Sequence, residues 1–171
     1  MLYFIRHGQT DQNKDNIFCT EEVLLNHTGV GQAKNLAHSM TGVDLDLVVT
    51  SPLVRARETA EIIIDELDMS NKQLIVDTLL REVELGVLTG KPSKGFSTAT
   101  IPSDTEGAET HKEVFNRAER LLKKYKNTDQ NTLLVGHSGI YRFLKTLNDN
   151  LNREDVAQIP TFEQGEFIIL H

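Results

Sequence analysis

The sequence predicts an α/β fold, a three-layer sandwich in which a mostly parallel central sheet has helices on both faces. Short runs rich in Ile, Val, Leu or Phe alternate along the chain with longer segments of helical pattern. Strands that alternate with helices favour a parallel sheet whose two faces are both covered. The length of 171 residues is enough for one core, and no internal repeat is present. We therefore expect a single domain over residues 1–171.

Each predicted strand is compact and is bounded by turn or polar residues. In chain order these runs are "LYFIR" (2–6), "LDLVVT" (45–50), "QLIVD" (73–77), "TLLVG" (132–136) and "EFIIL" (166–170).

The helical segments between these strands carry recognisable start signals. Asn26 is a predicted N-cap of the first. Ser51 is a predicted N-cap of the second, with Pro52 at its first helical position. The third has an apolar face that runs from Val114 to Tyr125, and it ends in lysines, as the helix dipole favours. The segments are residues 26–40, 51–67, 107–126 and 139–148.

Composition excludes several classes of function. The net charge is −7, so a broad basic surface for nucleic acid is not expected. Apolar runs are too short to span a bilayer, and the N-terminus lacks the pattern of a signal peptide. Cys19 is the only cysteine, which rules out an intrachain disulfide and agrees with a cytoplasmic location. No membrane partner is expected, and the sequence makes no prediction of the oligomeric state.

Ligands of open parallel sheets bind beyond the carboxyl ends of the strands. Four segments follow predicted strands there: "RHGQT", "TSPLVRA", "LLREVELG" and "GHSG". They carry Arg6, His7, Arg55, Glu82 and His137. Two arginines can hold an anion through forked donors, a histidine can act as a nucleophile, and a carboxyl can move a proton. This set of groups suits phosphoryl transfer through a phosphohistidine.

Together, "RHGQT", "SPLVRARETA", "LLREVELG" and "GHSG" resemble the histidine phosphatase superfamily, also called phosphoglycerate mutase-like. "LNHTGVGQA" and "GAETHKEVFNRAERLL" extend the resemblance over nearly the whole chain. A lone Arg-His-Gly would be a weak signal, whereas four ordered motifs at strand ends are specific. The resemblance is to the small phosphatase branch.

The resemblance implies a role for each matching residue. His7 would be the nucleophile that becomes phosphorylated, and Glu82 the proton donor. Arg6, Arg55 and His137 would contact the phosphoryl oxygens. Other matching positions are predicted to bind substrate or phosphate, and they are Gly8, Thr10, Asn13 and Ser138. The expected enzyme is a metal-independent phosphomonoesterase that needs no cofactor and acts on a small phosphorylated metabolite.

Several alternatives stay open at this stage. Glu84 lies two positions after Glu82 and is the other candidate carboxylate. A phosphoglycerate mutase would use the same residues, but family mutases carry a long basic insertion where this chain has a predicted cap of only 19 residues, 91–109. The candidate wall residues of the pocket are Phe18, Cys19, Phe96 and Ile101. A catalytically inactive binding or regulatory protein is a further alternative.

Two other chemistries fit the sequence poorly. A metal hydrolase could use His7 and His137, but paired arginines repel a dication and no His-Glu-x-x-His motif is present. A serine hydrolase could use Ser138, but Ile140 stands where the nucleophile elbow needs glycine.

Overall fold

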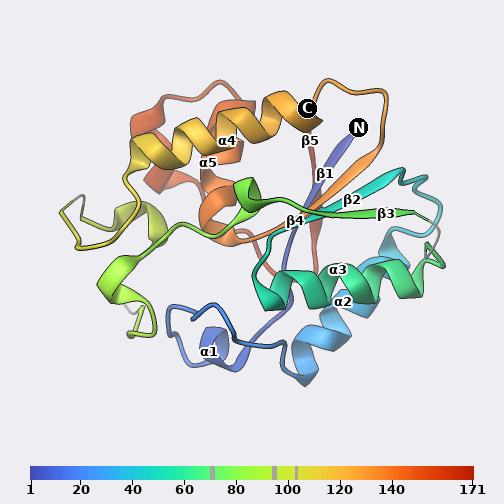
Figure 1. The fold of residues 1–171 in the computed structure, drawn as a ribbon, viewed down its shortest axis with the longest axis horizontal. Coiled ribbons are helices and arrows are strands. Elements are labelled where there is room, and N and C mark those ends of the chain that lie inside the picture. The colour runs from blue at the N-terminus through green and yellow to red at the C-terminus, as the bar shows by residue number, and fades with distance from the viewer. Residues whose placement is uncertain (70–71, 94–95, 103) are drawn as a thin grey trace.

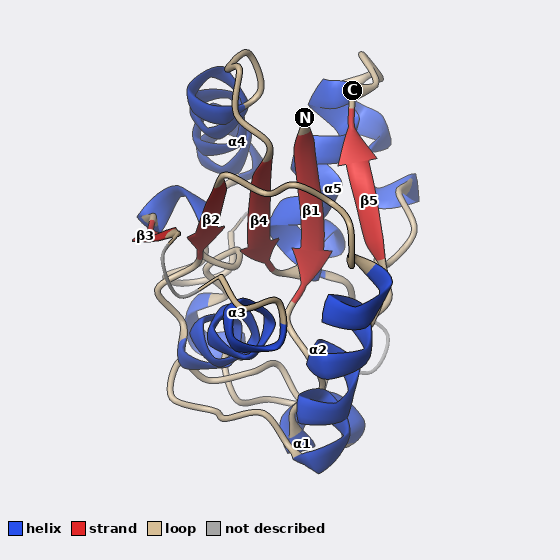
Figure 2. Cartoon of the chain, turned by 90° about the vertical axis from the view of Figure 1, so that its right-hand side faces the viewer, coloured by secondary structure: helices blue, strands red, loops and turns tan. Residues whose placement is uncertain are grey.

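The computed structural model describes residues 1–69, 72–93, 96–102 and 104–171, and it confirms the predicted α/β fold. Within these residues a five-stranded sheet has the order β3-β2-β4-β1-β5. The strands are Leu2–Arg6 (β1), Leu47–Thr50 (β2), Gln73–Val76 (β3), Thr132–Gly136 (β4) and Phe167–Leu170 (β5). Figure 2 shows β1, β2 and β4 pointing the same way and β5 pointing the opposite way, in agreement with its antiparallel pairing to β1.

Helices cover both faces of the sheet, as Figure 1 shows. The pair α2 and α3 lies against one face, and the pair α4 and α5 lies against the other. The bounds are Asp11–Lys14 (α1), His27–Ser39 (α2), Val54–Glu66 (α3), His111–Tyr125 (α4) and Ser138–Asn148 (α5). Short 3-10 helices span Thr78–Leu80, Gly86–Leu88, Thr98–Thr100 and Arg153–Gln158. The four-residue helix α1 was not anticipated from the sequence.

Alternate residues of the central strands enter two separate cores. Phe4 of β1 packs in the core beneath α4 and α5, and its neighbour Ile5 packs in the core beneath α2 and α3. Because successive side chains of a strand point to opposite faces, a strand buried on both faces must be apolar at every position. The run "LYFIR" is nearly continuously apolar for this reason.

Two of the helix starts agree with simple capping rules. The Asn26 side chain accepts a hydrogen bond from the Gly29 N–H (2.9 Å), which confirms Asn26 as the N-cap of α2. At the start of α4, Thr110 and Glu113 form a reciprocal capping box.

The predicted cap at Ser51 is wrong. Helix α3 begins at Val54, and its N-cap Leu53 makes no side-chain capping bond. Ser51 instead continues the hydrogen bonding of β2 by one residue, because its N–H donates to the Val135 carbonyl (3.0 Å). Pro52 disfavours the helical conformation at the residue that precedes it, so the chain leaves the sheet before the helix begins.

Hydrogen bonds of the sheet continue past the strand ends and bring three segments together. The His7 N–H donates to the Gly136 carbonyl (3.0 Å), and the Ser51 N–H donates to Val135. Since β4 lies between β1 and β2, the residues that follow these three strands are neighbours. The position of β4 therefore decides which side chains meet at the carboxyl edge.

Two glycines let the start of α2 approach the loop after β1. A Cβ on Gly8 would lie 2.4 Å from the Gly29 carbonyl oxygen, and a Cβ on Gly29 would lie 2.1 Å from the Gln9 carbonyl oxygen. Both clashes are with backbone, which has little room to move. The requirement for glycine here comes from helix packing.

In the described part of the chain, none of the helices combines the length and apolar character that crossing a bilayer requires.

We expect Gly29→Ala to reduce the free energy of unfolding by about 1–3 kcal/mol, because the new methyl group overlaps backbone atoms. Gly31→Ala in the same helix is the control, since a methyl group at that position would have no atom within 4 Å. It should stabilise the helix by roughly 0.5–1 kcal/mol. Urea unfolding measures both, and equal effects would contradict the packing argument.

Candidate active site

The candidate site forms where β1, β2 and β4 end side by side. His7 follows β1, Ser51 follows β2 and His137 follows β4. The imidazole rings of His7 and His137 lie with their centroids 5.0 Å apart, and both residues are buried. Strand ends that are far apart in the sequence thus place two imidazoles next to each other.

Hydrogen bonds assign the tautomer of His7. Its Nδ1 lies 2.7 Å from the Gly8 carbonyl oxygen, which can only accept, so Nδ1 carries the hydrogen. Its Nε2 lies 3.2 Å from Nε of Arg55, which can only donate, so Nε2 has a free electron pair. Burial, followed by the charges of Arg55 and Arg6, holds the pKa of His7 well below its ordinary value. His7 is therefore a neutral imidazole whose Nε2 carries the free electron pair.

A similar argument applies to His137. Its Nε2 lies 2.8 Å from the Ser51 hydroxyl, and that hydroxyl accepts from the Leu53 N–H (3.3 Å). The hydroxyl hydrogen of Ser51 can then be donated to His137 Nε2, which leaves the ring hydrogen on Nδ1. Burial and the charge of Arg55 hold the pKa of His137 well below its ordinary value. In the described structure this buried Nδ1 has no partner.

Two arginines flank His7, the buried Arg55 and the partly buried Arg6. The Arg55 side chain donates from Nη1 to the Thr20 carbonyl (2.9 Å), in addition to its contact with His7. Arg6 donates from Nη1 to the Phe162 carbonyl (3.1 Å), whereas its buried Nε has no partner among the described residues. Unpaired buried donors are costly, so Arg6 and His137 together provide hydrogen bonds that an anion would satisfy.

The Glu82 carboxylate lies at the N-terminus of α5. It accepts from the N–H groups of Val83 (2.9 Å), Gly139 (3.1 Å) and Ile140 (3.1 Å). The N-cap residue His137 supplies no side-chain capping bond, so Glu82 caps the helix instead. A Cβ on Gly139 would lie 2.2 Å from Glu82 Oε1, so this approach requires glycine. Helix capping thus places the carboxylate at the start of the helix that follows His137, on the wall of the cavity that His7 also lines.

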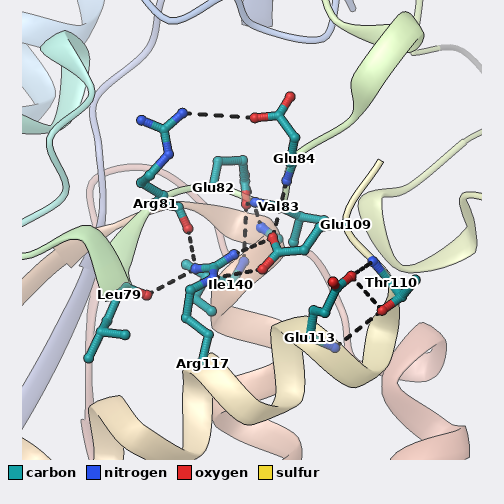
Figure 3. Close-up of polar contacts among 11 residues, drawn as sticks. Leu79, Arg81, Glu82, Val83, Glu84, Glu109, Thr110, Glu113, Arg117 and Ile140 are labelled. Atoms are coloured by element: carbon teal, nitrogen blue, oxygen red, sulfur yellow. Dashed lines mark hydrogen bonds and ion pairs between the residues drawn. The ribbon is translucent and has the colours of Figure 1, made fainter. Parts of the chain in front are cut away.

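Helix α4 holds the segment that carries Glu82, as Figure 3 shows. Arg117 donates from Nη1 to the carbonyl oxygens of Leu79 (2.9 Å) and Arg81 (2.7 Å). Its Nε and Nη2 donate to the two oxygens of Glu109 (2.9 and 2.6 Å). Glu109 also accepts a longer bond from the Glu84 N–H (3.3 Å). No motif in the sequence pointed to this pair, because eight positions separate its members.

A cavity of about 530 Å³ opens over these groups. The predicted residues on its wall are Arg6, His7, Asn13, Arg55, Glu82 and Ser138. Glu84 lies at its mouth with a half-exposed side chain, so Glu82 is the inner carboxylate of the two candidates. His137 is fully buried against His7. The catalytic roles of these residues remain predictions.

Gly8 and Thr10 are not among the residues that line this cavity, and their predicted contact with a ligand stays a prediction. The Gly8 N–H donates to the Thr59 hydroxyl (3.0 Å), and its carbonyl orients His7. Thr10 is fully buried, and its hydroxyl caps α1 by accepting from the Asn13 N–H (3.1 Å). Both residues position neighbours that line the cavity.

Sequence reasoning missed Arg142, which is buried in α5 and lines the cavity. It donates to the Thr161 hydroxyl (2.8 Å), and burial lowers its pKa. A signal was present, because Arg142 interrupts the apolar run of "GIYRFL" one helical turn after Ser138. Thr161 had no such signal, since it comes from an irregular segment.

The predicted cap, residues 91–109, contributes to the cavity together with the segment after α1. The Phe18 N–H donates to the Lys91 carbonyl (2.9 Å), and the Phe18 carbonyl accepts from the Gly90 N–H (2.8 Å). The cavity wall includes Phe18, Cys19 and Phe96 but not Ile101, which lines a second cavity of about 260 Å³. Residues 94, 95 and 103 of the cap lie outside the described residues.

Comparison with known proteins gives consistent results. A model of the histidine phosphatase superfamily (branch 1) matches residues 2–170. The adenosylcobalamin/alpha-ribazole phosphatase of Escherichia coli (strain K12) is 29% identical over 160 residues, or 84% of this chain and 76% of that protein. A 2,3-bisphosphoglycerate-dependent phosphoglycerate mutase of Thermoplasma acidophilum is 34% identical over 105 residues, or 60% of this chain and only 51% of the mutase. Mycobacterial glucosyl-3-phosphoglycerate phosphatase has the same fold (TM-score 0.82, 23% identity, 97% of this chain and 88% of that one).

The low pKa values of His7 and His137 predict a loss of stability in mild acid. Both groups bind a proton in the unfolded chain near pH 6.5 but resist protonation when folded. The free energy of unfolding therefore carries the full contribution of both histidines above about pH 6.5. Below that pH it declines by up to about 1.4 kcal/mol per pH unit for each histidine. Urea unfolding between pH 7.5 and 5.5 measures the slope. It should become shallower in His137→Gln, and an unchanged slope would contradict the assignment.

Proposed function

Because the chain belongs to the histidine phosphatase superfamily (branch 1), we propose that it is a phosphomonoesterase that acts through a phosphohistidine on His7. The observation that carries the proposal is the tautomer of His7. Its Nδ1–H is tied to the Gly8 carbonyl, and its nucleophilic Nε2 lies against Arg55. The substrate is a small phosphorylated metabolite, which fits a cavity of about 530 Å³.

In the first step, His7 Nε2 attacks phosphorus in line with the ester bond. An N–P bond forms as the P–O bond to the alcohol breaks, and the leaving oxygen takes a proton from the Glu82 carboxyl. Glu82 Oε2 accepts one hydrogen bond, from Gly139, so this oxygen keeps an electron pair that can carry the proton.

In the second step, Glu82 accepts a proton from water as the water oxygen attacks the phosphohistidine. The N–P bond breaks, inorganic phosphate leaves, and His7 returns to the neutral imidazole that its surroundings favour. One carboxyl thus regains in the second step the proton that it gave in the first.

Negative charge on the phosphoryl oxygens is balanced by Arg6 and Arg55, with His137 Nδ1–H as a further donor. Arg6 and Arg55 are held by the carbonyl oxygens of Phe162 and Thr20, and His137 by the Ser51 hydroxyl, so these groups need little reorganisation during the reaction. The unpaired Nε of Arg6 and Nδ1 of His137, both without partners among the described residues, support this role.

Hydrolysis is favoured over the alternative of mutase-type phosphoryl transfer. A mutase must protect its phosphohistidine from water and return the phosphoryl group to a bound product. The cap of 19 residues here holds two lysines and no arginine, and the match to the Thermoplasma mutase covers only 51% of that protein. The Escherichia coli relative that matches 84% of this chain is named as a phosphatase. An inactive binding protein is disfavoured because Arg6, His7, Arg55 and Glu82 line one cavity and the fifth predicted catalytic residue, His137, packs against His7.

The reaction is proposed to need no metal. Two arginines supply the positive charge that a metal ion would otherwise provide. Among the residues that the structure describes, no group of three or more His, Cys, Asp or Glu side chains is placed to hold a metal ion.

We expect a short incubation with a 32P-labelled phosphomonoester in excess EDTA to leave acid-labile, base-stable label on His7. His7→Asn should lose both label and turnover, because the nucleophilic nitrogen is absent. His38→Asn is the control, since this exposed histidine lies on α2 and outside the cavity lining. Loss of turnover in EDTA, restored by a divalent ion, would contradict the metal-free mechanism.

We expect Glu82→Gln to slow hydrolysis of alkyl phosphates by about 10²–10⁴-fold, the usual contribution of general acid–base catalysis. With an aryl phosphate, whose leaving group needs no proton, the first step should be spared and a burst of phenol should precede slow turnover. An unchanged inhibition constant for inorganic phosphate would show that the anion site is intact. If Glu84→Gln gave this dependence on leaving group and Glu82→Gln did not, the wrong carboxylate would have been chosen.

A further inference from the structure

The mouth of the cavity has a charge arrangement that differs from its floor. Arg81 lies at this mouth and forms an ion pair with Glu21, and the Glu84 carboxylate is 3.8 Å from its Nη2. Figure 3 shows the contact between Arg81 and Glu84. Among the described residues of the mouth, the positive charge of Arg81 is therefore already shared by two carboxylates, which leaves an excess of negative charge there.

The floor has the opposite sign. Arg6, Arg55 and Arg142 are positioned by carbonyl or hydroxyl oxygens, and the hydrogen bonds described for them include none to a carboxylate. The Nε of Arg6, unpaired among the described residues, marks this end as the place where an anion binds. A phosphomonoester bound at the floor would direct its alcohol portion toward Glu21 and Glu84.

We propose that this enzyme selects phosphomonoesters of uncharged or positively charged alcohols and discriminates against esters whose alcohol portion carries a carboxylate. The inference rests on the proposed function and names the substrate class of the same site. A carboxylate at the mouth would meet two like charges, and it would gain Arg81 only by displacing Glu21 or Glu84. The chain's net charge of −7 acts in the same direction.

Other residues of the cavity lining suit a polar or cationic alcohol. Hydroxyl groups line it at Thr89, Ser93, Ser97 and Thr98. Each can give or accept a hydrogen bond from an alcohol or amine. The Phe96 side chain is half exposed and offers an aromatic face to a cation. These groups give affinity without requiring a second anionic group on the substrate.

The test compares kcat/KM for three esters of similar size, each divided by the value for p-nitrophenyl phosphate. The probes are sn-glycerol 3-phosphate, phosphocholine and 3-phosphoglycerate, which carry a neutral, a positive and a negative alcohol portion. We expect 3-phosphoglycerate to be hydrolysed about tenfold less efficiently than glycerol 3-phosphate, and phosphocholine at least as well as the latter. Because the cause is electrostatic and the mouth is exposed, raising ionic strength from 0.02 to about 0.5 M should shrink the difference, since the Debye length falls to a few ångströms.

Charge-neutral variants separate this cause from pocket shape. Glu84→Gln and Glu21→Gln should each raise the ratio of 3-phosphoglycerate to glycerol 3-phosphate hydrolysis by about threefold or more. Glu119→Gln removes the same charge from the outer surface of α4, where Glu119 contacts Arg153, and should leave the ratio unchanged. The inference would be overturned, with the proposed function intact, if the wild-type enzyme preferred 3-phosphoglycerate. It would also be overturned if neither salt nor these variants changed the ratio of 3-phosphoglycerate to glycerol 3-phosphate hydrolysis. Failure to hydrolyse any ester, p-nitrophenyl phosphate included, would overturn the proposed function and this inference with it.

Discussion

Backbone hydrogen bonds of β4 to its two neighbours are the constraint on which the rest of the site depends. They continue one residue past the strands, from His7 to Gly136 and from Ser51 to Val135. Because this ladder fixes the spacing between strands, the side chains that follow β1, β2 and β4 have little freedom to separate. His7, Ser51 and His137 consequently lie close together, and their proximity does not depend on the conformation of the loops that follow.

The side chains of the candidate site are oriented mainly by backbone atoms. The Gly8 carbonyl sets the ring of His7, the Phe162 carbonyl and the Thr20 carbonyl hold Arg6 and Arg55, and three N–H groups hold Glu82. Backbone partners of this kind move little during a reaction, so the site is prepared before substrate arrives. Glycines at positions 8, 29 and 139 allow these close approaches, which explains why several short motifs contain them.

The same arrangement is unfavourable for the stability of the empty protein. Two histidines are kept neutral by burial and by neighbouring arginines, and donors of Arg6 and His137 are left without partners among the described residues. In the proposed mechanism a bound phosphoryl group would reverse both effects, because it would pair with the donors and offset the positive charge. The proposed affinity for an anion and the cost of these groups to stability would then have one physical origin.

The order of residues along the chain was enough to predict the layers, the strands and the inner residues of the site. Apolar runs such as "LYFIR" identify strands buried on both faces, and the parallel order places Arg6, His7 and His137 at one edge. Contacts between segments that are distant in the sequence could be identified only from the folded structure. Folding placed Thr10 as a helix cap, left Ser51 at the end of β2 where it reaches His137, and joined Arg117 to Glu109 beside the segment of Glu82. It also paired Arg81 with Glu21 across 60 positions, because charge neutralisation depends on distance in space, which no local pattern of residues encodes.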